Sequence, residues 1–141
     1  MKEIYKSVTT ILQGDPTLVG LVGFTATKMN IRRGFQTKGT WDKLVVYYMQ
    51  PDVVKTDFTN VIRDVPLIIR IYDRNNDLNV ETIAERIVVL LDDKDSGLDV
   101  VGELQVYDCS YKGTMIATSW NDKLKTFEKV LRFSLVVRIE N

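Results

Sequence analysis

The 141-residue sequence has no histidine, one cysteine, three prolines and no net charge at neutral pH. Without histidine it lacks the usual general acid or base near neutral pH and the commonest transition-metal ligand. Ser-His-Asp and Cys-His nucleophile systems are therefore excluded, as are zinc sites built from cysteine and histidine. The single Cys109 cannot form an internal disulfide, which favours a reducing compartment. Chemistry could still come from carboxylates, lysine or magnesium held by oxygen ligands.

The sequence also has no apolar run close to the roughly 20 residues that span a bilayer. Residues 1–6 mix both charge signs, so we expect neither a membrane segment nor a secretory signal. The 19 basic residues are offset by 19 acidic ones, whereas a dedicated DNA binder usually carries a basic excess that neutralises phosphates. Length and an apolar content of 45% predict one globular domain covering residues 1–141.

Hydrophobic periodicity predicts a mixed set of helices and strands. Ile4, Val8 and Ile11 lie on one stripe of an amphipathic helix over residues 2–13, and Asp15 with Pro16 predicts the cap and first turn of a short second helix. The clearest helical pattern covers residues 79–92. Strands are expected at residues 28–32, 44–50, 66–72, 100–111 and 126–139, with a polar loop at 52–64 and a turn or wide hairpin at 112–125.

The predicted order is therefore α-α-β-β-β-α-β-β. No β-α-β alternation is present to force a parallel, doubly wound sheet. We predict an α+β fold with a mainly antiparallel sheet of about four strands and with the helices packed on one face.

Acidic residues between positions 92 and 103 have spacings that occur in cation sites. Asp92, Gly97 and Glu103 match positions 1, 6 and 12 of a calcium-binding loop, but Lys94 stands where that loop needs an oxygen ligand. A solvated turn between a helix and a strand explains them better, and we expect no metal, cofactor or catalytic site. One alternative is a metal-dependent hydrolase that uses these carboxylates, namely Asp92, Asp93, Asp95 and Glu103.

Aromatic, methionine and arginine residues gather in two segments, residues 28–49 and 112–125. A basic and aromatic patch of this kind could contact nucleic acid by phosphate pairing and stacking, but these residue types are also enriched at protein interfaces, which is the interpretation we favour. Apolar residues in a connecting segment are covered either by the chain's own core or by a neighbouring subunit. The candidate contact residues are Arg32, Arg33, Phe35, Trp41, Tyr47, Met49, Met115, Ile116 and Trp120.

The order of elements carries a family resemblance. After the first helix comes a short element of the form D-P-x-L-x-x-L-V-G at residues 15–23, then an apolar strand at 44–49 and a strand with its turn at 68–76. The helix at 84–92 and the closing strand at 132–139 complete the pattern, which resembles the tail-terminator, or tail-completion, proteins of long-tailed bacteriophages. The sequence departs from that pattern at residues 39–42, where many relatives carry a proline-rich turn, and in the longer, more polar segment at 52–64.

The resemblance implies a structural virion protein of the tail or neck, assembled in the host cytoplasm. Such a protein forms a ring, commonly a hexamer, that caps the tail tube, ends its polymerisation and joins it to the head. Its implied partners are further copies of itself, the tail tube protein and the head-side connector, with no membrane and no specific nucleic acid, although DNA passes through such a ring. A head-tail connector or adaptor of the neck is the alternative within the same class.

Overall fold

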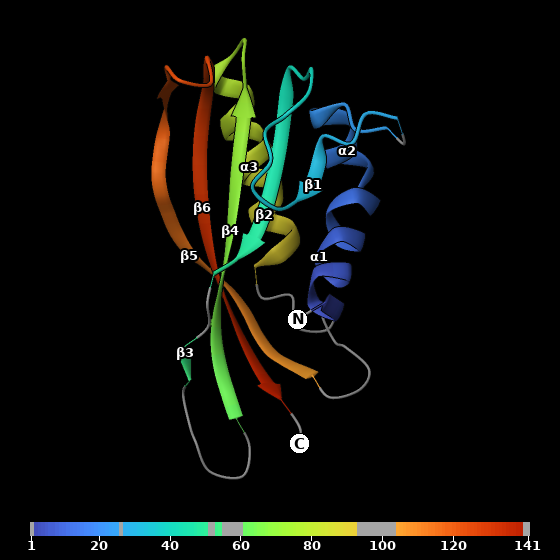
Figure 1. The fold of residues 1–141 in the computed structure, drawn as a ribbon, viewed down its shortest axis with the longest axis vertical. Helices are drawn as coiled ribbons and strands as arrows, with labels where there is room; N and C mark the ends of the chain where they lie inside the picture. Colours follow the sequence, from blue (N-terminus) through green and yellow to red (C-terminus); the bar gives the residue numbers. More distant parts are fainter. Residues whose placement is uncertain (1, 26, 51–52, 55–60, 93–103, 140–141) are drawn as a thin grey trace.

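The computed structural model describes residues 2–25, 27–50, 53–54, 61–92 and 104–139, in which three helices pack against one six-stranded sheet (Figure 1). The α+β class predicted from the sequence is therefore confirmed, with more strands than the four expected. The helices are α1 (Lys2–Gly14), α2 (Pro16–Val22) and α3 (Asp77–Leu91). The strands are β1 (Ile31–Arg33), β2 (Lys43–Met49), β3 (Val53–Val54), β4 (Val61–Asp73), β5 (Leu104–Asn121) and β6 (Thr126–Ile139).

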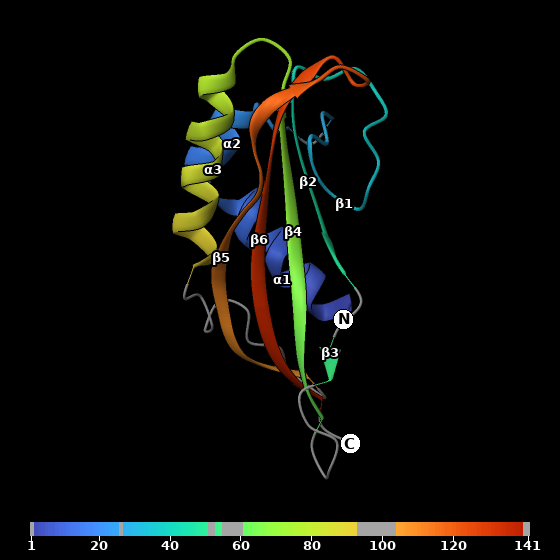
Figure 2. The same ribbon diagram turned by 90° about the vertical axis from the view of Figure 1, so that its left-hand side faces the viewer.

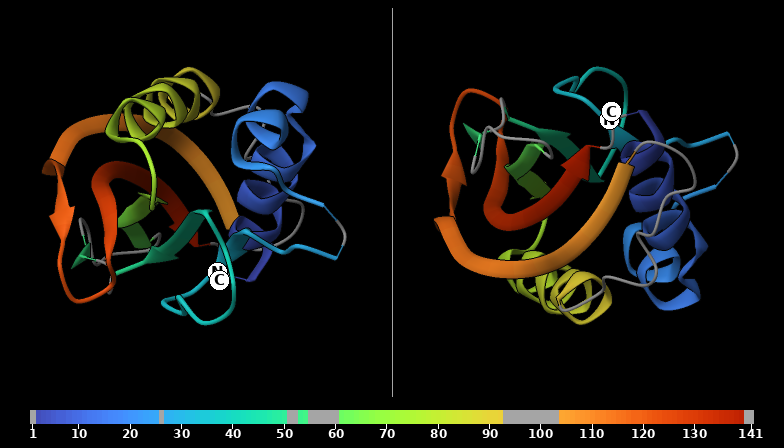
Figure 3. Two further views of the ribbon diagram at one scale, coloured as in Figure 1. Left: turned by 90° about the horizontal axis from the view of Figure 1, so that it is seen from above. Right: turned by 90° about the horizontal axis from the view of Figure 1, so that it is seen from below.

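The strand order in the sheet is β1-β2-β4-β6-β5, with β3 paired to β4 outside this path. All pairs are antiparallel except β1 with β2, so the sheet is mixed rather than purely antiparallel. Seen along the long axis of the molecule, the sheet is strongly twisted and curved (Figure 3). β4, β5 and β6 continue well beyond the end of α3, as Figures 1 and 2 show.

Local chemistry explains where the helices begin. Asp15 caps α2: its Oδ2 accepts a hydrogen bond of 2.8 Å from the Leu18 amide, and Pro16 occupies the first turn. The same carboxylate accepts hydrogen bonds of 2.9 and 2.7 Å from the Arg86 guanidinium, which ties α2 to α3. These bonds with Arg86 hold the pKa of Asp15 below its usual value. Asn76 caps α3 through a 2.8 Å bond from the Leu78 amide.

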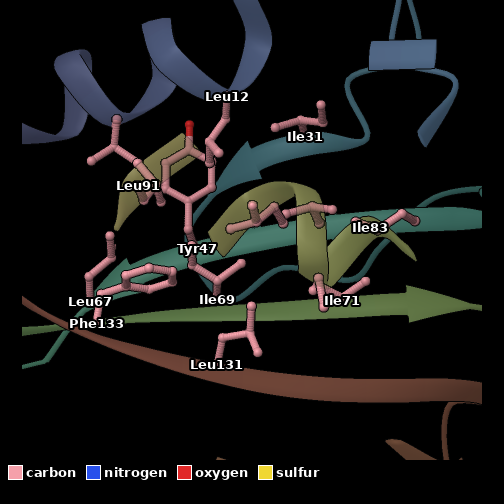
Figure 4. Close-up of a cluster of buried hydrophobic side chains, with 14 of the residues drawn as sticks. Leu12, Ile31, Tyr47, Leu67, Ile69, Ile71, Ile83, Leu91, Leu131 and Phe133 are labelled. Carbon is pink, nitrogen blue, oxygen red and sulfur yellow. The ribbon is translucent and has the colours of Figure 1, made fainter. Parts of the chain in front are cut away.

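The main core lies between the helices and one face of the sheet (Figure 4). Alternate residues of each strand point into it because strand side chains alternate between faces. Leu12 of α1 and Ile83 of α3 meet Tyr47, Ile69 and Leu131 of the three central strands, and all five are essentially inaccessible to solvent. Within the described ranges, no helix is long and apolar enough to cross a membrane.

Several element boundaries differ from those expected. The first strand is displaced to Ile31–Arg33, α3 begins at Asp77, and β4 begins at Val61 within the expected loop. The largest error concerns residues 112–125, because β5 continues to Asn121 and the turn occupies only residues 122–125. The register shifts along β5 break the alternation that identifies a strand in sequence, which explains that error.

Candidate interaction surface

The connection between β1 and β2 has an unusual path for its length. These two strands are parallel, yet only nine residues, 34–42, separate them, whereas parallel strands usually need a dozen or more. The connection therefore runs back along β1 over the sheet face opposite the helices. There Trp41 packs with Leu44, Val46 and Tyr72 in a second, smaller buried cluster.

Trp41 holds this connection against the sheet. Its indole N–H donates a 2.7 Å hydrogen bond to the Thr37 carbonyl, and its ring lies 5.7 Å from that of Tyr72. The Arg74 guanidinium carbon lies 4.1 Å from the indole centroid, on the solvent side of the cluster. Only 7% of Trp41 is exposed. The expectation that Trp41 presents contact surface is therefore wrong for the free chain, in which it fastens the connection to the sheet.

Tyr47 is likewise a core residue rather than an exposed one. It is fully buried, its hydroxyl is hydrogen bonded to that of Thr9 on α1, and burial raises its pKa. Met49, at the end of the same strand, is partly buried against the main core, and its amide donates a 2.7 Å bond to the Tyr5 hydroxyl. The expectation of exposed aromatic surface at Tyr47 is thus also wrong.

Phe35 lies on the surface of the β1–β2 connection. Its ring lies 4.1 Å from that of Tyr48, and 72% of the residue is exposed. Arg33 is also exposed and reaches the ring of Tyr5, 5.2 Å from its centroid. Among the described residues, Tyr48 is the one aromatic ring that packs beside Phe35, so a large apolar side chain is left on the surface here.

The outer part of β5 carries the other exposed apolar residues. Met115, Ile116 and Trp120 are 50%, 38% and 48% exposed. Trp120 meets Phe127 of β6 edge-on at 4.9 Å. Among the described strands, β5 pairs only with β6, so its other edge has no strand partner. The pairing of β5 with β6 has four register shifts, which twist β5 locally. A twisted edge pairs poorly with strands of unrelated chains, but a partner of matching shape can still bind it.

Glu81 of α3 fixes the β5–β6 hairpin to the helical layer. Its carboxylate accepts a hydrogen bond from the Thr118 hydroxyl on β5 and forms a 2.8 Å ion pair with Lys129 on β6. The bonds from Lys129 and Thr118 lower the pKa of Glu81. These two contacts join both strands of the hairpin that carries Trp120 to α3.

A basic hollow of about 650 Å³ lies between residues 22–32 and 38–43, at the β1 edge of the sheet. Its basic lining residues are Lys28, Arg32, Lys38 and Lys43. Asn30, which is 8% exposed, forms part of its wall: the side-chain amide donates to the carbonyls of Val22 and Lys43 at 2.8 and 3.3 Å. Among the described residues, the Asn30 Oδ1 and the Arg32 Nε have no hydrogen-bond partner. From the sequence, Arg32 is a candidate contact residue and the whole lining falls in or beside the basic and aromatic segment 28–49, but the hollow itself and the part that Asn30 plays in it are not predicted.

The structure brings the two expected contact segments to the same end of the molecule. Lys43, Asp73 and Phe127 lie side by side in the sheet, and Leu124 of the hairpin turn packs on the Trp41 cluster. Trp120 pairs with Phe127 on the helix side, whereas Phe35 and Ile116 lie with Tyr48 and Val130 on the opposite face. The exposed candidates therefore form more than one patch.

The carboxylates considered for metal binding give no described site. Asp92 uses its Oδ1 to accept a 2.9 Å hydrogen bond from the Tyr111 amide of β5. Asp93, Asp95, Gly97 and Glu103 lie outside the described residues. Over the parts of the chain that are described, no three potential ligands cluster closely enough for a metal ion. Cys109 is fully buried in the core, as expected of a packed side chain rather than a nucleophile.

Comparison with known proteins finds likeness in structure but not in sequence. No protein-family model matches the sequence, and no curated protein matches it. Among solved structures, the chain is similar to a chain from the virion of a native gene transfer agent (GTA) particle, with a TM-score of 0.72 and 16% sequence identity. The match covers 93% of this chain and 91% of that one. At this identity the likeness establishes a shared fold over almost the whole length of both chains.

Proposed function

We propose that this chain is a structural protein of a phage-like virion and that it acts there as the tail terminator. In this role, copies of the chain form a ring on the last ring of the tail tube, stop its polymerisation and provide the surface that joins the head. The observation that carries the proposal is the fold shared with a GTA virion chain over 93% of the sequence. The element order, which resembles that of tail terminators, adds an independent argument.

The surface chemistry supports an assembly role. Phe35, Met115 and Trp120 are large apolar side chains of which 72%, 50% and 48% are exposed. The sheet ends in two different edges, β1 and β5, so a head-to-tail contact between copies would bring unlike surfaces together. Contacts of that heterologous kind generate closed rings when the rotation between subunits divides a full turn. A protein that acts by occupying the end of a growing tube requires no catalytic group.

Electron microscopy of particles made without the protein tests the proposal. A stop codon early in the gene of the encoding phage is expected to give tails of excessive and variable length that are not joined to full heads. Tails of normal length that fail to join heads would assign the chain to the neck connector instead. Infectious particles of normal appearance would contradict a structural role altogether.

A further inference from the structure

Positive charge is concentrated around the basic hollow. In a chain with no net charge, residues 27–43 contain five basic residues and one acidic residue, Asp42. The lining of the hollow holds four of those five together with Asp42, an excess of three positive charges (four minus one). The four are Lys28, Arg32, Lys38 and Lys43. Like charges that line one hollow repel one another, and an anion placed among them relieves that repulsion.

These four side chains are not paired with carboxylates in the described part of the chain. Neither Asp42 nor any other described carboxylate lies within ion-pairing distance of their charged nitrogens. The structure describes instead a 3.0 Å hydrogen bond from the Arg32 Nη1 to the Lys38 carbonyl. Lys28 and Lys38 are exposed, whereas Arg32 and Lys43 are half-buried. The hollow therefore carries positive charge that the described residues leave uncompensated.

The backbone around the hollow is held in place by the chain itself. The Asn30 amide nitrogen donates to the Val22 and Lys43 carbonyls at 2.8 and 3.3 Å, which joins two sides of the hollow. Trp41 is buried, and its bond to the Thr37 carbonyl fixes the connection between β1 and β2. A site whose backbone is already ordered loses less entropy when a ligand binds.

The arrangement of the basic side chains suits phosphate better than carboxylate. They come from four places, namely the segment before β1, β1 itself, the β1–β2 connection and the start of β2. The oxygens of a phosphate group point in several directions and accept from several donors, whereas a carboxylate has two oxygens in one plane. Trp41, the one aromatic residue of the described lining, is 7% exposed and lies beside the Arg74 cation, so it offers no ring on which a base could stack.

We propose that the basic hollow binds phosphate groups, presented either by the backbone of a nucleic acid strand or by a free polyphosphate. Its basic side chains pair with the phosphate oxygens and no base is contacted, so binding does not depend on base sequence. The volume of about 650 Å³ lies within the range of roughly 300–1,000 Å³ that is typical of ligand sites. This inference goes beyond the proposed virion role and does not depend on it.

Fluorescence anisotropy of a labelled oligothymidine, titrated with the purified full-length chain, tests the proposal. A Lys28→Gln/Lys38→Gln variant is expected to bind about tenfold more weakly, and the slope of log K against log salt should fall to roughly half because two of four phosphate contacts are lost. A Lys28→Arg/Lys38→Arg variant keeps both charges and should bind as the wild type does. A Lys6→Gln/Lys123→Gln variant removes the same charge at exposed positions outside the hollow and should leave affinity and slope unchanged. Urea denaturation checks that all three variants fold.

Competitors identify the source of the phosphate. If sodium tripolyphosphate displaces the oligonucleotide, and binds the Lys28→Gln/Lys38→Gln variant more weakly, a free polyphosphate is a ligand. If the oligonucleotide binds and tripolyphosphate does not displace it, the phosphodiester backbone is the ligand. Three results would overturn the proposal: no binding, equal losses in the hollow and control variants, or displacement by polyglutamate at the charge concentration at which tripolyphosphate acts. The stop-codon experiment tests the virion role separately, so each conclusion can fail without the other.

Discussion

Replacing Trp41 with alanine is expected to destabilise the fold strongly. The substitution removes a 93%-buried indole from the cluster with Leu44, Val46 and Tyr72, and Trp-to-Ala changes in cores cost about 3–5 kcal/mol. Within that total, the contact with the Tyr72 ring contributes about 0.5–1.5 kcal/mol, the Arg74 cation about 0.5–1 kcal/mol and the hydrogen bond to Thr37 about 1 kcal/mol. With a urea slope of about 2 kcal/mol per molar, the midpoint should fall by about 2 M.

Trp120→Ala provides the matched comparison for this prediction. This side chain is 48% exposed and makes one ring contact, with Phe127, so its removal should cost about 1 kcal/mol or less while reducing assembly into particles. Both variants are followed by urea denaturation with circular dichroism, because each substitution removes one of only two tryptophans and changes the fluorescence. A Trp41→Ala variant that unfolds at the wild-type urea concentration would refute the structural role assigned to this residue.

Three further predictions concern single sites. Arg86 lowers the folded-state pKa of Asp15, so Asp15 should make the wild type more stable than an Asp15→Asn variant, which keeps the acceptor for the helix cap. This difference in unfolding free energy should be full above the unfolded-state pKa of Asp15 and should disappear as the pH falls through the lower folded-state pKa. Urea titrations of both proteins from neutral to acid pH measure it, and a difference that does not change with pH would contradict the ion pair. Gly113→Ala should lower the free energy of unfolding by about 1–3 kcal/mol, because φ is +113° at this position. Gly20→Ala, in helix α2 with open space around it, should instead raise it by about 0.5–1 kcal/mol. If the two variants melt at the same temperature, the backbone conformation described for β5 at Gly113 is wrong. Cys109 should react with a thiol reagent only as fast as the chain unfolds, and immediate labelling in buffer would mean that its strand is open to solvent.

The sequence predicts the helices and the central strands because their signals are local. Asp15 and Pro16 determine the start of α2, and the apolar spacing from Val80 to Leu91 identifies α3. The alternation from Leu131 to Leu135 likewise identifies β6. Each of these patterns is a property of neighbouring residues, so no knowledge of the tertiary fold is needed to read it.

The candidate surface was harder to predict because burial depends on distant partners. The neighbouring residues in the sequence do not show that Trp41 is buried and Trp120 is not. Trp41 is buried because the connection between β1 and β2 packs it against Tyr72, whereas Trp120 lies on the β5–β6 hairpin and is 48% exposed. The basic hollow was missed for a similar reason: Asn30 lines it only because the parallel pairing of β1 with β2 brings residues 22–32 and 38–43 together. The charge pattern itself was visible, since five basic residues fall within seventeen positions of a neutral chain.

Cryo-electron microscopy of phage-like particles released by cells that carry this gene is the decisive experiment for the proposed role. We expect the reconstruction to contain this fold as a closed ring of copies between the tail tube and the head. A reconstruction in which that ring has a different fold, together with absence of the chain from purified particles by mass spectrometry, would contradict it.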